Sequence, residues 1–311
     1  MEITKETQIS QKQKRTGIKS CIIESWKVFA LNTKVFFKYL WLHLFIAGLG
    51  YALFSFIGCN FYTKHILSAN AYIASGYDAS LSKALFAPGV SDYLILGVAF
   101  LAFIFANYLM LGACFSQIRF YKATDSLPVA SPFTFWGEIR KDGKKTFIYD
   151  LIIIVTVSLC TAVITLISWA TSWWVMLLLI PILIYWTVIG TNGRLQYVVE
   201  NKSLKVALKN AFKVGHHKFG GYLILLILTG IPTALMAYIA MLPGTIIQLA
   251  FEADQLSQLA GDPSGVPPYV LILYVLLATF GYALLSIAYT LQQWPLALYT
   301  SAVAGSQQES K

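Results

Sequence analysis

Polar side chains inside long apolar stretches are the residues of this sequence that could do chemistry, because burying such groups is costly. Asn107 lies in the middle of one stretch, and Asp150 lies about one turn into another. Asp150 is expected to reach the interface or to pair with Lys144 or Lys145, and its functional alternative is a gate or a ligand for a coupling ion. For Asn107 the alternatives are a hydrogen bond between helices and a contact with a substrate.

Other polar and helix-breaking residues in these stretches fit structural roles. His43, one turn into the first stretch, is expected at the interface, as is the pair Gln292-Gln293 at the end of the last. Pro181 and Pro232 are expected to interrupt helical hydrogen bonding, with the kink at Pro232. Broken helices line some transport sites, although proline is also common in ordinary membrane helices.

No enzyme signature accompanies these residues. The sequence lacks the GxxxxGK[ST] phosphate-binding loop, the GxSxG nucleophile motif and the HExxH zinc motif. His216 and His217 are adjacent, so on a helix they point about 100° apart and share no face. The cysteines form no CxxC pair and are expected to be small apolar fillers: Cys21, Cys59, Cys114 and Cys160. We therefore expect no enzyme activity, no cofactor and no metal site.

Six apolar stretches must position the polar residues. Hydrophobic residues make up 57% of the 311 residues and charged residues 12%, against about 25% charged in a soluble domain. Each stretch supplies the roughly 20 apolar residues that a helix needs to cross about 30 Å of hydrocarbon. Because they are apolar on all sides, they predict helices: Tyr39–Ile57, Tyr93–Phe115, Phe147–Trp169, Trp173–Gly193, Phe219–Met241 and Tyr269–Leu291.

Basic residues fix a predicted orientation for these helices. Of the 23 Lys and Arg residues, all but Lys64 and Lys83 lie before the first stretch, after the second, after the fourth or in the tail. By the positive-inside rule both termini then face the cytoplasm of a plasma (inner) membrane. The first 20 residues are polar and lack a cleavable signal peptide, so the first helix is expected to stay as an anchor. The formal charge of +9 thus indicates contact with anionic lipid and no nucleic-acid partner.

A threefold pattern organises the chain. Each unit has a basic amphipathic segment followed by two spans, and the second segment begins at Ser131-Pro132. We predict that each segment is an interfacial helix on the cytoplasmic leaflet, with its apolar face on lipid; the alternative is a helix packed on the cytoplasmic ends of the bundle. In the third segment, which Ser203 could cap, the apolar face is Leu204, Ala207, Leu208, Ala211 and Gly215. Lysines of the first and third segments are the candidate contacts to anionic lipid: Lys27, Lys34, Lys38, Lys205, Lys209 and Lys213.

The predicted fold is therefore all-α: a polytopic membrane protein with six transmembrane helices in three hairpins, each preceded by a basic amphipathic helix. A disordered cytoplasmic N-terminus over 1–20 precedes the membrane domain over 21–295, and 296–311 is a cytoplasmic tail. On the outer side, a tight hairpin is expected at Ala170-Thr171 and an amphipathic surface helix after Pro243-Gly244. The connection over 58–92 has room for one or two short surface helices.

With its hydropathy pattern and the motifs Glu24–Leu31 and Ser203–Lys213, the chain resembles a broad bacterial group of uncharacterised six-helix membrane proteins. That group includes the membrane domain fused to some glycerophosphodiester phosphodiesterases. The resemblance implies a fold and a location, but this chain has no room for a phosphodiesterase domain, so that activity does not carry over.

The resulting functional prediction is a non-enzymatic membrane scaffold, accessory or lipid-interacting protein, whose partners are anionic lipids of the cytoplasmic leaflet and a membrane protein. The alternative is a transporter or permease component for a small solute or lipid, using Asn107, Asp150 and the two proline kinks. A polar cavity at mid-bilayer favours the alternative, and a closed apolar bundle favours the first interpretation.

Overall fold

The computed structural model describes residues 17–74, 88–129, 131–259, 265–267 and 269–309, and over these ranges it contains helices and no strand. Six helices are long and apolar enough to cross a membrane by length and composition. The chain is therefore an all-α, multi-pass membrane protein, as the hydropathy predicts. In order, the elements are α2 (Ile18–Ala74), α4 (Val90–Thr124), η1 (Pro132–Phe135), α5 (Trp136–Ala170), η2 (Trp173–Leu178), α6 (Leu179–Val198), α7 (Leu204–His217), α8 (Phe219–Leu259) and α9 (Tyr269–Glu309).

The chain divides into two compact units. Unit 1 comprises Met1–Leu40, Leu111–Thr233 and Tyr289–Lys311, and unit 2 comprises Trp41–Met110 and Ala234–Ala288. Helices α2, α4, α8 and α9 each contribute one part to unit 1 and one part to unit 2.

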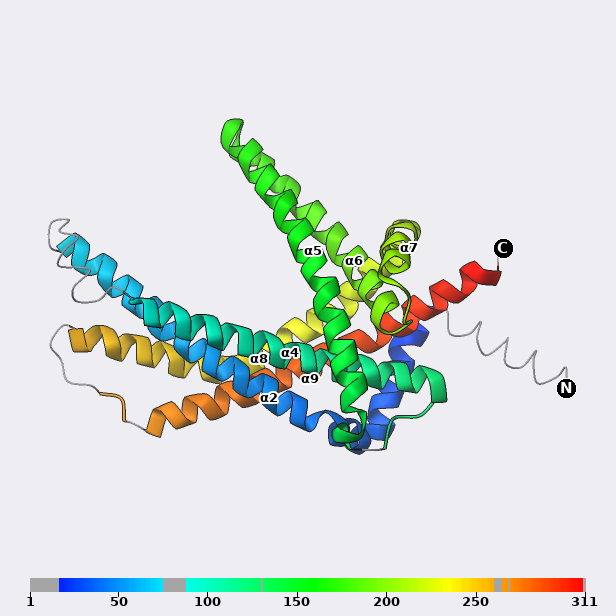
Figure 1. The fold of residues 1–311 in the computed structure, drawn as a ribbon, viewed down its shortest axis with the longest axis horizontal. Helices are drawn as coiled ribbons and strands as arrows, with labels where there is room; N and C mark the ends of the chain where they lie inside the picture. The colour runs from blue at the N-terminus through cyan, green and yellow to red at the C-terminus, as the bar shows by residue number, and fades with distance from the viewer. Residues whose placement is uncertain (1–16, 75–87, 130, 260–264, 268, 310–311) are drawn as a thin grey trace. The chain divides into compact units, whose positions relative to one another are not determined.

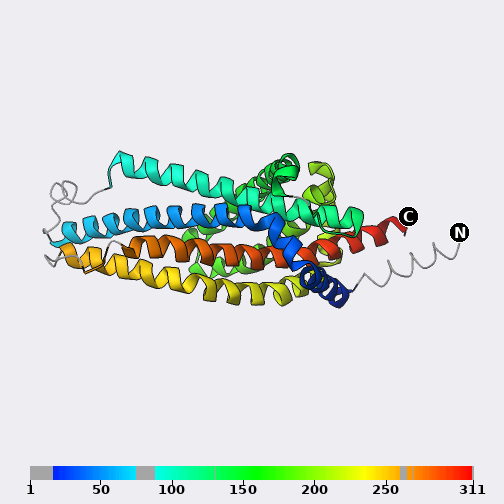
Figure 2. The ribbon, with the colours of Figure 1, turned by 90° about the horizontal axis from the view of Figure 1, so that it is seen from below.

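Unit 2 is a bundle of four helix segments, from α2, α4, α8 and α9, which lie alongside one another in Figures 1 and 2. Small residues bring its backbones together: a Cβ added to Gly48 would collide with the carbonyl of Thr279, and one added to Gly281 with the carbonyl of Ala240. Close approach through glycine is typical of helix packing in membranes, where hydrophobicity alone does not draw helices together.

Unit 1 contains the helical pair α5 and α6. The connection between them is only Thr171 and Ser172, and α5 packs along α6 and η2 (Figure 1). This is the tight connection expected at this position. Gly112 of α4 contacts the α5 backbone so closely that a Cβ would collide with the Ile139 carbonyl, and Gly193 of α6 leaves room for the Tyr149 hydroxyl.

Several helices extend beyond the apolar stretches that predict them. Helix α2 continues to Ala74, so the part of the 58–92 connection up to that residue is helix and not a separate surface element. Helix α8 passes through Pro243 to Leu259, so the separate outer helix expected after Pro243-Gly244 is wrong. Helix α9 passes the expected tail boundary at 295 and ends at Glu309, and Leu296 is fully buried. Residues 1–16, 75–87 and 260–264 of the predicted terminus and outer connections lie outside the described residues.

The three basic segments differ from one another. In α2, Asn32 has non-helical dihedrals (φ −124°, ψ 21°), so a kink separates the first basic segment from the spanning part. Helix α5 is continuous from Trp136, and its basic residues belong to the spanning helix itself, which contradicts a separate second interfacial helix.

The third basic segment forms a helix of its own, α7. Ser203 occupies its N-cap position with extended dihedrals but makes no capping hydrogen bond through its side chain. Ala207, Ala211 and Gly215 are buried, and Gly215 lies against Ile189 of α6. The prediction that this face rests on lipid is therefore wrong, because small side chains allow close contact with α6 instead.

Candidate functional site

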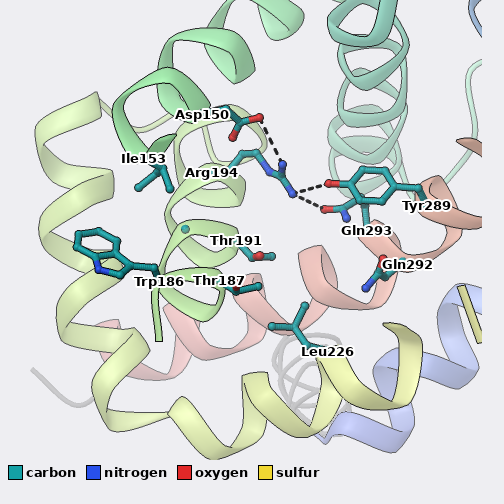
Figure 3. Close-up of a pocket in the computed structure, with 11 residues that line it drawn as sticks. Asp150, Ile153, Trp186, Thr187, Thr191, Arg194, Leu226, Tyr289, Gln292 and Gln293 are labelled. Atoms are coloured by element: carbon teal, nitrogen blue, oxygen red, sulfur yellow. Dashed lines mark hydrogen bonds and ion pairs between the residues drawn. The ribbon is translucent and has the colours of Figure 1, made fainter. Parts of the chain in front are cut away.

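A cavity of about 290 Å³ in unit 1 is the candidate functional site (Figure 3). Helices α5, α6, α8 and α9 supply its walls. The lining residues are Asp150, Ile153, Trp186, Thr187, Gly190, Thr191, Arg194, Leu226, Tyr289, Gln292 and Gln293.

Helical spacing places the lining residues on single faces. Trp186, Gly190 and Arg194 follow one another at four-residue intervals on α6, and Asp150 and Ile153 are three residues apart on α5. Residues at these intervals are neighbours on a helix surface. Because α5 and α6 are antiparallel, Asp150 of α5 meets Arg194 of α6, about twenty residues of helix away from the Thr171-Ser172 connection on each side.

Arg194 is the centre of the polar end of the cavity. Its Nη1 lies 3.5 Å from Asp150 Oδ2, and its Nη2 donates to the Tyr289 hydroxyl at 2.8 Å and lies 3.3 Å from Gln293 Oε1. The guanidinium carbon is 5.6 Å from the centre of the Phe115 ring, within range of a cation–π interaction. The Arg194 side chain is 13% exposed, and its buried Nε has no hydrogen-bond partner among the described residues. The guanidinium therefore borders the cavity with its Nη atoms bonded to neighbouring side chains and its Nε enclosed by protein.

The cavity changes from polar to apolar along its length. Figure 3 shows Asp150, Arg194 and Gln293 close together, whereas Trp186 and Leu226 lie away from the ion pair. Trp186 precedes Arg194 by eight residues on α6, which is about 12 Å of helix. The Thr187 hydroxyl, near the apolar end, bonds to the Leu183 carbonyl of its own helix at 2.7 Å. The arrangement suits an amphiphile with its polar group at Arg194.

A buried network behind the cavity ties α6 to α8 and α9. Gln196 Nε2 and the Tyr222 hydroxyl both donate to Asn192 Oδ1 at 3.0 Å, and the same hydroxyl lies 3.1 Å from Thr300 Oγ1. These four side chains are almost fully buried. Because Asn192 is two residues from Arg194, the network fixes the rotation of α6 and holds Arg194 toward the cavity.

Asp150 is a predicted site residue that the structure places in the cavity, with a different partner. The expected pairing with Lys144 or Lys145 is wrong: Asp150 pairs with Arg194, and Lys145 bonds to Asn201. A carboxylate on α5 pairs across to α6 because the two helices are in contact along their length.

Asn107 belongs to unit 2 and lines no part of this cavity. Its Oδ1 accepts a hydrogen bond from the Tyr282 hydroxyl at 2.6 Å, and its Nδ2 donates to the Phe103 carbonyl at 2.9 Å. The bond to Tyr282 joins α4 to α9, so the geometry agrees with the interhelical alternative.

The structure locates the residues that were expected at the interface or at a kink. His43 is fully buried, and Gln293 is 1% exposed and lines the cavity, so protein surrounds both side chains, and their depth in a membrane stays a prediction. Pro181 is the third residue of α6, in the first turn, where its missing N–H costs no intrahelical bond. Pro232 lies within α8, one residue before the last unit 1 residue of that helix.

The candidate lipid-contact lysines are all exposed, as such contacts require: Lys27, Lys34, Lys38, Lys205, Lys209 and Lys213. Lipid contact itself stays a prediction.

Sequence reasoning missed Arg194 as a site residue, because it directly follows an apolar stretch and therefore counted as a loop cation. The signal was present in its neighbours. Leu195, Val198 and Val199 are apolar and buried, which indicates that the helix and its protein environment continue past Arg194.

Fold and site together define a class: a multi-pass, all-α membrane protein with a buried arginine at the polar end of an amphipathic cavity. Among the residues that the structure describes, no group of three or more His, Cys, Asp and Glu side chains could hold a metal ion. No protein-family model, no curated protein and no solved structure matches the chain. The resemblance to uncharacterised six-helix membrane proteins therefore stays a prediction.

Proposed function

We propose that this chain is a non-enzymatic membrane protein that binds a phospholipid by its headgroup phosphate in the Arg194 cavity. The observation that carries the proposal is the largely buried Arg194 guanidinium, which lines one end of a cavity whose other end is apolar. Arginine suits this role because its planar fork matches the oxygens of a phosphate, and hydrogen bonds between charged groups are the strong ones.

The depth of the cavity supports a lipid headgroup as the ligand. Asp150 lies near the start of one predicted span, Arg194 just after the end of another and Gln293 just after the end of a third. With both termini in the cytoplasm of a plasma membrane, which we also propose, these three residues lie at the level of the cytoplasmic headgroups. A phospholipid in that leaflet would present its phosphate to Arg194 and its chains toward Trp186.

The size of the cavity points the same way. About 290 Å³ is at the lower end of the range for ligand sites. It accommodates a headgroup and the beginning of the acyl chains near Trp186, with the rest of the chains against the outer surfaces of the helices.

The transporter alternative has less support. It calls for a polar site at mid-bilayer, and Asn107, the amide predicted at that depth, is used in bonding α4 to α9. A bound lipid that positions the protein for a membrane partner agrees with the accessory role expected from the sequence.

Lipid retention by the purified full-length chain tests the proposal. The main variant is the double substitution Arg194→Gln/Asp150→Asn, because removing the arginine alone would leave a buried carboxylate uncompensated. We expect native mass spectrometry to show at least about tenfold less retained phospholipid than in the wild type, since loss of a charged hydrogen bond costs about 1.5–3 kcal/mol.

The matched control is Lys141→Gln, which removes an exposed positive charge from α5 at a position outside the cavity and outside the candidate lipid contacts. It should retain lipid like the wild type. Equal retention by the double variant and the control would refute the proposed site.

Reporter insertion tests the proposed orientation separately. A reporter placed after Thr124, at the end of α4, should report a cytoplasmic location, and one after Ser75 or Ala260, both outside the described residues, should report the opposite side. The reverse pattern would place the cavity at the outer leaflet.

A further inference from the structure

The charges in the cavity cancel each other. Among the lining residues that the structure describes, Asp150 is the one acidic residue and Arg194 is the one basic residue. The other lining side chains are neutral near pH 7. An anionic headgroup would therefore add an uncompensated negative charge beside Asp150. Burying an unpaired charge is unfavourable, whereas a headgroup with one positive and one negative group leaves the site neutral.

We infer that the cavity selects an ethanolamine phosphodiester, with the phosphate on Arg194 and the ammonium on Asp150. This inference rests on the proposed function and specifies its ligand. Two carbons separate the phosphate oxygen and the ammonium of the ligand, and Arg194 and Asp150 lie side by side in the site. Each charge of the ligand can therefore meet a protein charge of the opposite sign.

Binding in this way replaces the Asp150–Arg194 ion pair by two ion pairs with the ligand, and the geometry of the pair allows this replacement. The Oδ2–Nη1 separation of 3.5 Å is longer than the 2.7–2.9 Å typical of a charged hydrogen bond. Arg194 is held in place by Tyr289 and Gln293, not by Asp150 alone. A ligand can therefore approach each member of the pair without first dismantling the position of the arginine.

The uncharged polar lining favours a primary ammonium over a quaternary one. An ammonium carries three N–H donors, and Gln292 and Thr191, whose side chains each carry an acceptor oxygen, line the cavity together with Asp150. A trimethylated nitrogen has no donor for these acceptors and is larger. The cavity is thus expected to favour phosphatidylethanolamine over phosphatidylcholine as well as over phosphatidylglycerol.

Competition between lipids with identical acyl chains tests the inference. The full-length wild type is mixed with equal amounts of phosphatidylethanolamine, phosphatidylglycerol and phosphatidylcholine, and retained lipids are counted by native mass spectrometry. We expect about tenfold preference for phosphatidylethanolamine. Asp150→Asn, which removes the negative charge but keeps the shape, should abolish the preference over phosphatidylglycerol, and Lys141→Gln should keep it.

The wild type alone provides a second measurement, should Asp150→Asn fail to fold. Retention should fall stepwise along the series of ethanolamine, N-methyl-, N,N-dimethyl- and trimethyl-headgroups, because each methyl removes a donor. A flat series, or a wild type that retains phosphatidylglycerol equally well, would overturn the ethanolamine assignment while leaving phosphate binding at Arg194 intact.

Water-soluble glycerophosphoethanolamine distinguishes a lipid from a free headgroup. Binding of the diacyl lipid at micromolar concentration, with the soluble compound at least a hundredfold weaker, is expected because the apolar end contributes to lipid binding. Binding of the soluble compound without the lipid would refute the proposed function, and so would lipid retention that does not depend on Arg194.

Discussion

The charge cluster around Arg119 provides the sharpest test of the packing in unit 1. Arg119 of α4 donates through Nη1 to Asp142 Oδ1 at 2.8 Å and pairs through Nη2 with Glu138, both on α5. The three side chains differ strongly in exposure: 0% for Asp142, 24% for Arg119 and 50% for Glu138. The second carboxylate oxygen of Asp142 is buried with no hydrogen-bond partner among the described residues.

These exposures predict unequal costs for three substitutions. Arg119→Met leaves the buried Asp142 carboxylate uncompensated, and breaking a buried pair in this way costs about 3–5 kcal/mol of unfolding free energy. Asp142→Asn leaves Arg119 partly exposed and still paired with Glu138, so we expect a loss of about 1–2 kcal/mol. Glu138→Gln breaks a half-exposed contact and should cost less than about 1 kcal/mol.

The double variant Arg119→Met/Asp142→Asn makes the test stricter. Removing the buried charge together with its partner should recover about 2 kcal/mol relative to Arg119→Met alone, because the penalty in the single variant comes from the stranded carboxylate. If Arg119 acted only through packing, adding Asp142→Asn to Arg119→Met would not raise the unfolding free energy.

Unfolding free energies can be measured by titrating the full-length chain in mixed micelles with sodium dodecyl sulfate, followed by intrinsic fluorescence. Arg140→Met is the matched control, since it makes the same change at an exposed arginine on α5. The reasoning would be refuted by equal losses for Arg119→Met and Asp142→Asn, or by a double variant less stable than either single one.

Three further predictions concern pH, helix contact and membrane packing. Burial alone would raise the pKa of Glu200. The charge of Lys122 and its hydrogen bond lower this pKa by more than burial raises it, so the net pKa lies below the usual value of about 4.3. The contact therefore stabilises the fold above about pH 4.3, and its contribution is lost as the pH falls through the folded-state pKa. The melting temperatures of wild type and Glu200→Gln should differ at pH 7, and the difference should shrink as the pH is lowered below about 4.3. Gly112→Ala should destabilise by about 2 kcal/mol or more, because its Cβ meets the α5 backbone, whereas Gly97→Ala, in open space on the same helix, should change unfolding free energy by less than about 1 kcal/mol; similar melting temperatures for the two variants would contradict the close α4–α5 contact. Asn107→Leu should cost about 0.6 kcal/mol and leave lipid retention unchanged, and loss of retention in a folded variant would connect Asn107 to the ligand.

The ends of the helices show where sequence reasoning stopped being sufficient. Apolar content falls at Gln292-Gln293, which predicts the end of the last span, yet α9 continues to Glu309 because Leu296 and Thr300 are buried in unit 1. Helix α8 likewise continues beyond Pro243, to Leu259. Hydropathy reports where lipid can surround a helix, whereas protein contacts decide how far the helix continues.

The site shows the same division between local and long-range information. Asp150 was identifiable because a carboxylate inside an apolar stretch is costly wherever its partner lies. Its partner was not identifiable, since charge spacing along α5 favours the nearby lysines, and only the packing of α5 on α6 brings Arg194 into range.

The sequence by itself determined that the chain is a multi-pass helical membrane protein. Backbone N–H and C=O groups cannot be left unpaired in hydrocarbon, so long apolar segments have few alternatives to a helix. Tertiary structure alone decided that Arg194, Asp150, Tyr289 and Gln293 share one cavity and that the small-residue face of α7 packs on α6. Those outcomes depend on which helix faces meet, and helix contacts in a membrane follow from shape and a few polar groups that the hydropathy of one helix does not contain.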